Sequence, residues 1–293
     1  MTLDGKVAVV TGAGAGLGRA EALALARAGA DVVVNDVADS DVVDEIESLG
    51  AKAVLVRGDV SDSDVAKEIT ATAVDRFGGL HILVNNAGVL RDRMLFNMSD
   101  DEWDLVVRVH LRGHFLLSRN AAAYWRGQAK ANGGTTYGRV VNTASEAFLF
   151  GSEGQPNYAA AKAGITALTL ATARGLARYG VKANAICPRA RTAMTAGVFG
   201  DAPEGDVDPL SPEHVAPLVA YLASPAAEKI SGQVFVVYGG MVALLAPPTV
   251  EARFDDPQWT HESLDTALGG YFADRDPKKT FSATELMMLE EDQ

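Results

Sequence analysis

Several features that mark particular classes of protein are scarce or missing in this chain. Cys187 is the single cysteine, so a framework of disulfides within the chain is excluded, and we expect its thiol to be a small buried group. No N-terminal signal pattern and no uninterrupted apolar run of about 18 residues occurs, which argues against secretion and membrane spanning. We therefore expect a cytoplasmic protein.

Basic residues are also fewer than acidic residues. The chain has 26 Lys and Arg against 38 Asp and Glu, which gives a net charge of −12. An acidic protein is repelled by nucleic acid and by anionic membranes, so neither is expected as the main partner. A local basic pocket for a charged small molecule stays compatible with this balance.

The composition is that of an ordinary globular protein, with 293 residues, 48% of them hydrophobic. Short apolar runs alternate with helical segments, which predicts an α/β fold with a doubly wound parallel sheet covered on both faces. We expect one domain over residues 1–246, including a substrate loop over 189–212, and a C-terminal extension over 247–293. The predicted strands are Val7–Thr11, Asp31–Asp36, Lys52–Asp59, His81–Gly88, Arg139–Thr143, Val181–Cys187 and Val234–Tyr238.

A glycine-rich run follows the first predicted strand. Gly12, Gly16 and Gly18 precede a helix that we expect to begin near Arg19. Glycines let the backbone turn sharply and approach a pyrophosphate, which then lies against the amides of the helix N-terminus. Such a run is also compatible with a plain tight loop, but the strand before it and the helix after it favour a dinucleotide.

The second predicted strand ends in an acid, Asp36, eighteen residues after Gly18. A carboxylate there can accept hydrogen bonds from the adenosine ribose hydroxyls and would repel a 2′-phosphate. This favours NAD over NADP as the cofactor, and the alternative is that Asp36 is only a turn residue.

A second set of polar residues lies in the middle of the chain. Tyr158 and Lys162 are four residues apart in an Ala-rich run that favours helix, so both side chains project from one face. An ammonium beside a phenol is expected to lower the phenol pKa and make it a usable acid and base. Ser145 follows a predicted strand that would bring its hydroxyl to the same pocket. Alone, the Tyr and Lys spacing is also compatible with an accidental pair on a solvated helix.

Together, the Thr11–Gly18 run and the Ser145, Tyr158 and Lys162 set resemble the short-chain dehydrogenase/reductase family. The resemblance implies a Rossmann-type seven-stranded sheet of order 3-2-1-4-5-6-7 and no metal. It also implies that Ser145 orients a substrate hydroxyl, Tyr158 moves its proton, and Lys162 assists Tyr158 and contacts the ribose. The cofactor-binding residues that it implies are Gly12, Gly16, Leu17, Gly18, Asp36, Asp59, Val60, Asn86, Ala87, Gly88, Tyr158, Lys162, Pro188 and Thr192.

Three further stretches narrow the resemblance: Arg91–Arg93, His110–Gly113 and Arg189–Met194. They are similar to the 3-hydroxyacyl-CoA dehydrogenases of the peroxisomal multifunctional enzyme type 2 group and to actinobacterial enzymes that oxidise sterol side chains as CoA thioesters. This implies NAD-dependent interconversion of (3R)-3-hydroxyacyl-CoA and 3-oxoacyl-CoA, with a steroid acyl part as one option. The alternatives are a 17β-hydroxysteroid dehydrogenase, a 3-oxoacyl-carrier-protein reductase and a non-catalytic dinucleotide-binding scaffold.

Arginines and two departures from the family pattern bear on the substrate site. The phosphates of CoA could meet Arg91, Arg93, Arg112, Arg189 and Arg191, although solvated or structural roles are the alternative for each. His110 stands where the family has an Asn of the proton relay, so it is either a relay participant or a packed imidazole. Arg189 stands after Pro188 where the family usually has Gly.

Two expectations concern assembly. The resemblance implies a homodimer or homotetramer in which the long helices starting near Asp100 and Pro156 pair with their copies. The extension over 247–293 carries apolar residues at helical spacing, so we expect it to pack on the domain or on a neighbouring subunit. These residues are Trp259, Leu264, Leu268, Tyr271 and Phe272.

Overall fold

The computed structural model describes residues 2–203, 207–277 and 279–283. Its centre is one eight-stranded sheet of order β3-β2-β1-β4-β5-β6-β7-β8, in which the first seven strands run parallel to one another. The predicted α/β fold and the order of its seven strands are therefore confirmed. The strands are β1 (Val7–Thr11), β2 (Asp31–Asp36), β3 (Ala53–Arg57), β4 (Ile82–Asn85), β5 (Gly138–Thr143), β6 (Val181–Pro188), β7 (Val234–Tyr238) and β8 (Met241–Leu244).

The eighth strand was not predicted. β8 pairs antiparallel with β7, and Tyr238 lies opposite Met241 across the two-residue turn Gly239-Gly240. Gly239 has φ +49, a backbone conformation that glycine adopts without strain. A Gly-Gly pair between two apolar runs is the sequence signal of a hairpin, and it was available in the sequence.

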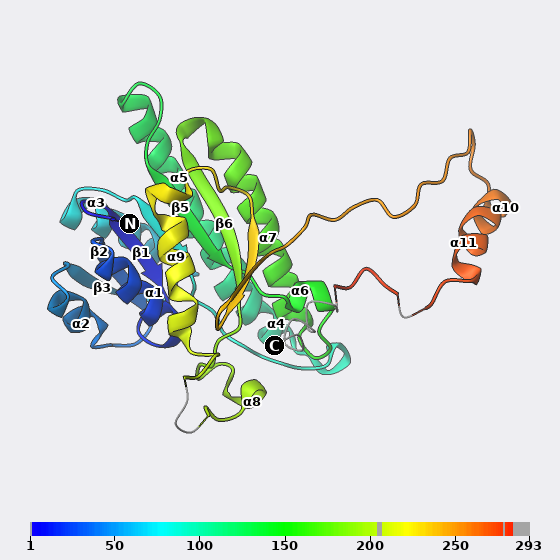
Figure 1. The fold of residues 1–293 in the computed structure, drawn as a ribbon, viewed down its shortest axis with the longest axis horizontal. Coiled ribbons are helices and arrows are strands. Elements are labelled where there is room, and N and C mark those ends of the chain that lie inside the picture. The colour runs from blue at the N-terminus through cyan, green and yellow to red at the C-terminus, as the bar shows by residue number, and fades with distance from the viewer. Residues whose placement is uncertain (1, 204–206, 278, 284–293) are drawn as a thin grey trace. The chain divides into compact units, whose positions relative to one another are not determined.

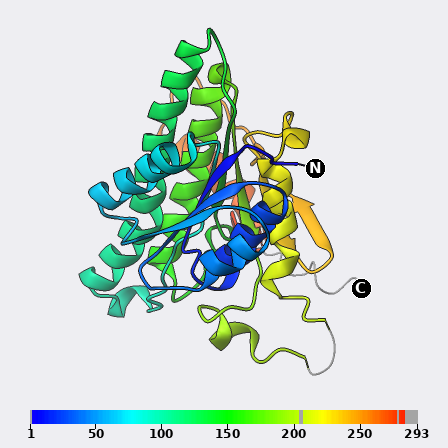
Figure 2. The same ribbon diagram turned by 90° about the vertical axis from the view of Figure 1, so that its left-hand side faces the viewer.

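Helices cover both faces of the sheet. The buried side chains of each strand point alternately to one face and to the other, so both faces are apolar. In β1, Ala8 and Val10 belong to one apolar cluster, whereas Val7 and Val9 belong to another. The first cluster packs under α1 (Gly16–Arg27), α2 (Val42–Ser48) and α9 (Ala216–Ala223). The second packs under α3 (Ser63–Phe77), α4 (Asp100–Val107), α5 (Gly113–Ala131) and α7 (Pro156–Leu176). The two layers are visible on either side of the sheet in Figures 1 and 2.

Shorter elements complete the fold. A π-helical segment, Arg108–Arg112, joins α4 to α5, so the chain is helical without a break from Asp100 to Ala131. The predicted substrate loop contains α8 (Ala196–Phe199), while its residues 204–206 lie outside the described part of the chain. The other short helices are α6 (Ala147–Phe150), α10 (His261–Leu264) and α11 (Gly270–Ala273), with 3-10 turns at Leu95–Asn97, Ala177–Tyr179, Pro212–His214 and Pro225–Ala227.

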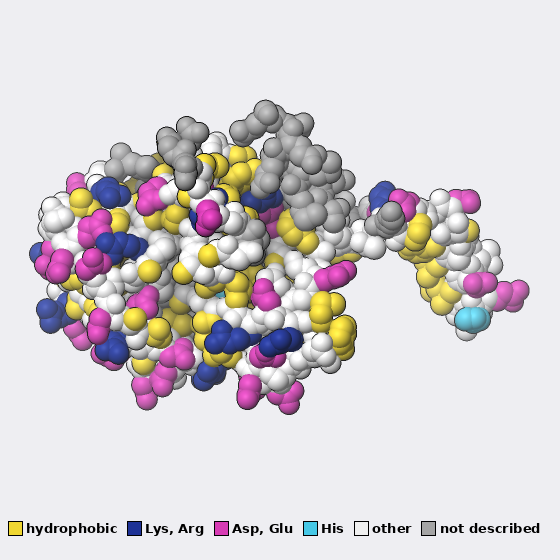
Figure 3. Space-filling model, turned by 90° about the horizontal axis from the view of Figure 1, so that it is seen from below, with side chains coloured by type: hydrophobic (Ala, Val, Ile, Leu, Met, Phe, Trp, Pro, Cys, Tyr) yellow, Lys and Arg dark blue, Asp and Glu magenta, His cyan; other side chains and the backbone are white. Residues whose placement is uncertain are grey.

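Contacts divide the chain into two units, one of residues 1–148 with 152–245 and one of residues 149–151 with 246–293. Within the second unit, Tyr271 makes edge-to-face contacts with Phe254 and Phe272, at centroid distances of 5.3 and 5.2 Å. Apolar side chains line one side of its helical segment in Figure 3, where acidic and basic side chains are interspersed over the larger unit. That the extension packs on a subunit stays a prediction, and residues 284–293 lie outside the described range. Among the residues that are described, no helix is long and apolar enough to cross a membrane.

Candidate active site

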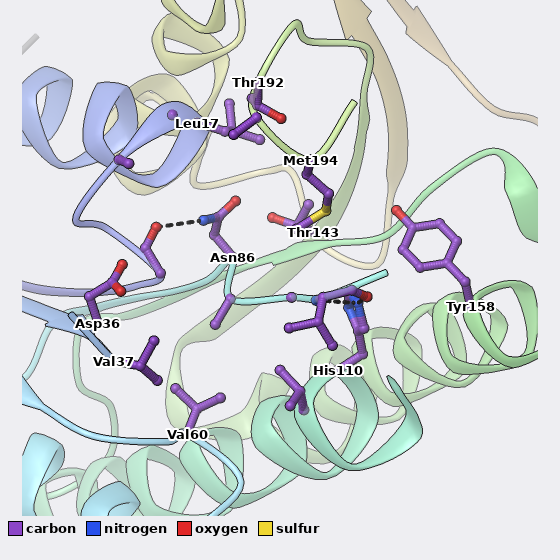
Figure 4. Close-up of a pocket in the computed structure, with 18 of the residues that line it drawn as sticks. Leu17, Asp36, Val37, Val60, Asn86, His110, Thr143, Tyr158, Thr192 and Met194 are labelled. Carbon is purple, nitrogen blue, oxygen red and sulfur yellow. Dashed lines mark hydrogen bonds between the residues drawn. The ribbon is translucent and has the colours of Figure 1, made fainter. Parts of the chain in front are cut away.

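A cavity of about 520 Å³ opens at the carboxyl ends of the central strands. Asp36, Val37 and Val60 lie at one end of it and Tyr158 at the other, with Asn86 and His110 between them (Figure 4). Most residues predicted for the site line this cavity: Gly12, Gly16, Leu17, Asp36, Asp59, Val60, Asn86, Ala87, Gly88, His110, Tyr158, Lys162, Pro188 and Thr192. Gly18 and Ser145 do not line it, although they contact residues that do.

The glycine run forms the turn between β1 and α1, and α1 begins at Gly16 rather than near Arg19. Gly16 has φ +54, in the left-handed region that other residues avoid. A Cβ on Gly18 would lie 2.3 Å from the carbonyl oxygen of Gly12, so Gly18 serves close packing. Ala15 at the N-cap provides no capping side chain, and the first turn of α1 has no acid. The free amides of this helix N-terminus fit a pyrophosphate.

Asp36 is fixed by two backbone amides. Its Oδ2 accepts from the amide of Gly14 at 2.9 Å, and its Oδ1 accepts from the amide of Ala38 at 3.2 Å. The carboxylate therefore braces the glycine turn while lining the cavity, and the two interpretations of Asp36 are compatible. Asp59 does not cap α3, because its Oδ1 accepts from Ser61 and the N-cap is Asp62.

Thr11 holds the segment after β4 against the glycine turn, a role that the sequence did not reveal. Its hydroxyl oxygen accepts from the amides of Asn86 and Ala87 at 3.0 and 3.1 Å. The side-chain amide of Asn86 donates back to the carbonyl of Thr11 at 3.1 Å. These bonds join the ends of β1 and β4, which form the floor of the cavity.

The Ser145, Tyr158 and Lys162 side chains come together at the other end. Nζ of Lys162 donates to the carbonyl of Thr143 at 2.5 Å and lies 5.3 Å from the centroid of the Tyr158 ring. Ser145 follows β5, and its hydroxyl forms a hydrogen bond with Tyr158 that lowers the pKa of the phenol. The spacing in α7 and the approach of β5 are as the sequence predicted.

The electrostatics of this group differ from the expectation that Lys162 lowers the pKa of Tyr158. Burial raises the pKa of Tyr158 to about 12, and the hydrogen bond from Ser145 opposes this only in part. Burial also lowers the pKa of Lys162 to about 7, because its ammonium has lost most of its water. Desolvation therefore moves the pKa of Tyr158 in the direction opposite to the one expected.

His110 lies in the π-helical segment and is 1% exposed. Its Nε2 meets both main-chain groups of Val89: the amide lies at 3.1 Å and the carbonyl oxygen at 2.8 Å, so the tautomer decides which bond forms. The ring packs edge-on against Tyr158 at 5.2 Å between centroids, while Nδ1 has no partner among the described residues. Burial and the charge of Lys162 lower the pKa of His110 well below its usual value. The imidazole is thus packed and neutral beside the phenol.

Sequence comparison decides the family. The profile described as short chain dehydrogenase matches residues 6–202 of the chain. The chain belongs to the short-chain dehydrogenase family. It is accordingly an oxidoreductase that acts on CH-OH groups with a nicotinamide dinucleotide.

Individual relatives of this dehydrogenase cover most of its length. It is 65% identical to the hydroxyacyl-CoA dehydrogenase ChsB1 of Mycobacterium tuberculosis, over 97% of this chain and 94% of that protein. It is 40% identical to the peroxisomal multifunctional enzyme type 2 of Mus musculus, over 84% of this chain but 33% of that larger protein. A crystal structure of a short chain dehydrogenase from Mycobacterium avium superposes with a TM-score of 0.85 at 43% identity, covering 94% of this chain and 98% of the other.

The arginines expected at a CoA phosphate differ in whether another side chain or a distant carbonyl already holds them. Arg189 forms a two-pronged ion pair with Glu146 and its side chain is only 10% exposed, so its prediction is wrong. Arg191 is committed to Asp208 at 2.9 Å. Arg93 and Arg112 are exposed but bonded to Glu102 and to the carbonyl of Ser61. Arg91 is exposed, lines the cavity and donates only to the neighbouring carbonyl of Leu90 in the contacts observed.

Two buried titratable residues near the site were not singled out in the sequence. Both carboxylate oxygens of Glu21 in α1 lack a partner among the described residues, and burial raises the pKa of this acid to about 8, against the opposing charge of Lys162. Burial lowers the pKa of His114 in α5 to about 3. The only signal for Glu21 is an acid on the buried face of an Ala- and Leu-rich helix.

Proposed function

We propose that this dehydrogenase interconverts (3R)-3-hydroxyacyl-CoA and 3-oxoacyl-CoA, with NAD as its cofactor. The observation that carries the proposal is one cavity lined by the glycine turn and Asp36 and by Tyr158 and Lys162, with Ser145 hydrogen-bonded to Tyr158. The hydroxyacyl-CoA activity named for the relative that is 65% identical supports the choice of substrate. A reducing compartment such as the cytoplasm suits its single, buried cysteine.

Selection of NAD rests on Asp36. Its carboxylate lies at the cavity end beside Val37, which is 65% exposed, and two amides fix its position. A fixed negative charge there repels a 2′-phosphate and accepts hydrogen bonds from ribose hydroxyls. When bound, the nicotinamide would donate or accept the hydride. Residues of the chain donate or accept the proton.

In ketone reduction, Tyr158 donates the proton of its hydroxyl to the substrate oxygen, and Ser145 holds that oxygen in place. A pKa of about 12 keeps the phenol protonated at neutral pH, as this direction requires. In alcohol oxidation the phenol must first lose its proton. The charged form of Lys162, whose Nζ lies 5.3 Å from the centroid of the ring, favours that loss because it stabilises the phenolate.

The segment that follows β4 carries groups that suit a charged thioester with an apolar chain. Arg91 lines the cavity with its guanidinium exposed, where it can meet a phosphate of CoA. Leu95 and Phe96 follow a few residues later and are 70% and 79% exposed. An acyl chain would remove such apolar side chains from water.

We also propose that the dehydrogenase is a homodimer or homotetramer. Large apolar side chains are exposed on the two helical stretches expected to pair: Trp103 and Phe115 on the stretch from Asp100 to Ala131, and Leu170 on α7. Exposed apolar groups on long helices are typical of subunit interfaces. Light scattering that finds only a 30.8 kDa species would contradict this part.

The experiment that tests the function follows NADH oxidation with three substrates: acetoacetyl-CoA, a steroid with a 3-oxoacyl-CoA side chain, and a 17-ketosteroid without CoA. We expect both thioesters to be reduced with a far higher kcat/KM than the free ketosteroid. Added salt should raise KM for the thioesters, because it screens their phosphates from Arg91. Fastest turnover of the free ketosteroid would favour a 17β-hydroxysteroid dehydrogenase, and no turnover of any would favour a scaffold.

A further inference from the structure

A buried ion pair beside the catalytic group has no part in the proton transfer just described. Nε and Nη2 of Arg189 donate to the two carboxylate oxygens of Glu146 at 2.7 and 2.9 Å. The side chains are 10% and 7% exposed. The guanidinium also lies 4.9 Å from the centroid of the Tyr238 ring at the end of β7. This is the two-pronged geometry that fixes a carboxylate most rigidly.

The ion pair matters because of the two segments of the chain that it joins. Glu146 directly follows Ser145 in the turn after β5, whereas Arg189 directly follows Pro188 at the end of β6 and opens the loop that carries Thr192. The hydroxyl oxygen of Ser145 also accepts from the amide of Ala147 at 3.2 Å, which fixes the side chain of Ser145 within the same turn. The pair thus ties the serine turn to the base of the substrate loop.

We infer that Glu146 and Arg189 are positioning residues, which hold Ser145 in the geometry that reaches Tyr158 and the substrate oxygen. The inference deepens the proposed function and rests on it. A buried carboxylate and guanidinium are costly to separate, because each would be left desolvated without its partner. The turn that carries Ser145 therefore cannot shift without moving the base of the loop, and a small displacement of a reacting group is enough to slow a reaction markedly.

A second buried arginine, near the start of the strand that leads to Ser145, provides a control. Arg139 at the start of β5 is 2% exposed and pairs with Glu228 at 2.5 Å, at the opposite end of the strand from Ser145. Glu228→Gln and Glu146→Gln each remove one negative charge that faces a buried arginine, although Glu228 is itself 60% exposed and also pairs with Lys182. They differ in whether the arginine anchors the serine turn.

The test combines Glu146→Gln with Ser145→Ala in a double-mutant cycle, with NADH and acetoacetyl-CoA as substrates. We expect Glu146→Gln to lower kcat about tenfold or more, with KM for NADH changed little, and Glu146→Asp to recover part of the loss. In the Ser145→Ala background, Glu146→Gln should have no further effect on kcat, because it acts through Ser145. Glu228→Gln should leave kcat unchanged. An unaltered kcat in Glu146→Gln, or the same loss in both backgrounds, would overturn the inference.

Hydrogen–deuterium exchange followed by mass spectrometry gives a readout that does not depend on the substrate. Peptides over residues 144–148 and 189–195 should both exchange faster in Glu146→Gln and be unchanged in Glu228→Gln. Unchanged exchange in Glu146→Gln would overturn the inference even if acetoacetyl-CoA proves not to be a substrate. Failure of the wild-type protein to reduce any thioester, with the expected exchange, would instead overturn the proposed function alone.

Discussion

The two ends of the cavity are built in different ways. At the nucleotide end the functional groups belong mostly to the main chain: a turn with glycines, the free amides of α1, and Asp36 held by the amides of Gly14 and Ala38. At the catalytic end they are titratable side chains: Lys162 and His110 are buried, and Tyr158 is partly buried.

The two ends also differ in how the loss of water affects their functional groups. Backbone amides are neutral at every pH, so the hydrogen bonds that they offer to phosphates at the nucleotide end do not depend on a titrating group. At the catalytic end, burial raises the pKa of Tyr158 to about 12 and lowers that of Lys162 to about 7. Changes at the nucleotide end should therefore affect cofactor binding. Changes at the catalytic end should affect turnover and its dependence on pH.

The largest effect is expected for Tyr158→Phe. The ring still packs against His110, but no proton can be moved, so kcat should fall by about a thousandfold or more. NADH affinity, measured by fluorescence titration, should stay within a few-fold of wild type. Turnover at a tenth of the wild-type rate would rule out Tyr158 as the proton donor.

The substitution Gly18→Ala tests the nucleotide end of the cavity. Its Cβ would lie 2.3 Å from the carbonyl oxygen of Gly12, so the turn must shift, and we expect NADH to bind about tenfold more weakly. Gly175→Ala in α7 is the control, because its Cβ meets no atom within 4 Å and alanine favours a helix. Equal NADH affinity in the two variants would show that the glycine turn does not hold the nucleotide.

Asp36→Ala should have a smaller and more selective effect. Loss of the carboxylate should remove its hydrogen bonds to the ribose and its repulsion of a 2′-phosphate, so NADH should bind a few-fold to about tenfold more weakly and NADPH more tightly. Asp39→Ala, which removes an exposed carboxylate paired with Arg57, is the matched control. NADPH binding as tight as NADH binding in the wild-type protein would contradict the assignment of Asp36.

The smallest effect concerns Glu21, whose pKa is raised by burial from 4.5 to about 8. Between these values the folded state binds more protons than the unfolded state. Stability contributed by this acid is therefore fully present below pH 4.5 and is lost as pH rises through about 8. Glu21→Gln should remove this loss, so its advantage in Tm over wild type should grow with pH, to about 5 °C near pH 8. A difference in Tm that is constant with pH would contradict a buried, protonated Glu21.

The nucleotide end was largely predictable from the sequence, whereas the catalytic end was predictable only in part. Gly12, Gly16 and Asp36 could be identified because their roles depend on local turns and strand ends. The spacing of Tyr158 and Lys162 within one helix was equally informative. The shifted pKa values could not be read in advance, since burial depends on distant parts of the chain packing together.

The same reason explains the features that were missed. Glu146 and Arg189 are 43 residues apart, and nothing local pairs them, so Arg189 was assigned to a CoA phosphate instead. Thr11 bonds to amides 75 and 76 residues away. The strand β8, by contrast, follows a Gly-Gly turn directly and could have been found from its local pattern.

The most direct test of the proposed activity offers the protein NAD with the separate enantiomers of 3-hydroxybutyryl-CoA and follows the absorbance of NADH. The account predicts that NADH forms with the (3R) enantiomer and not with the (3S), and that replacing NAD by NADP lowers the rate strongly. Formation of NADH from the (3S) enantiomer, or from neither, would contradict it.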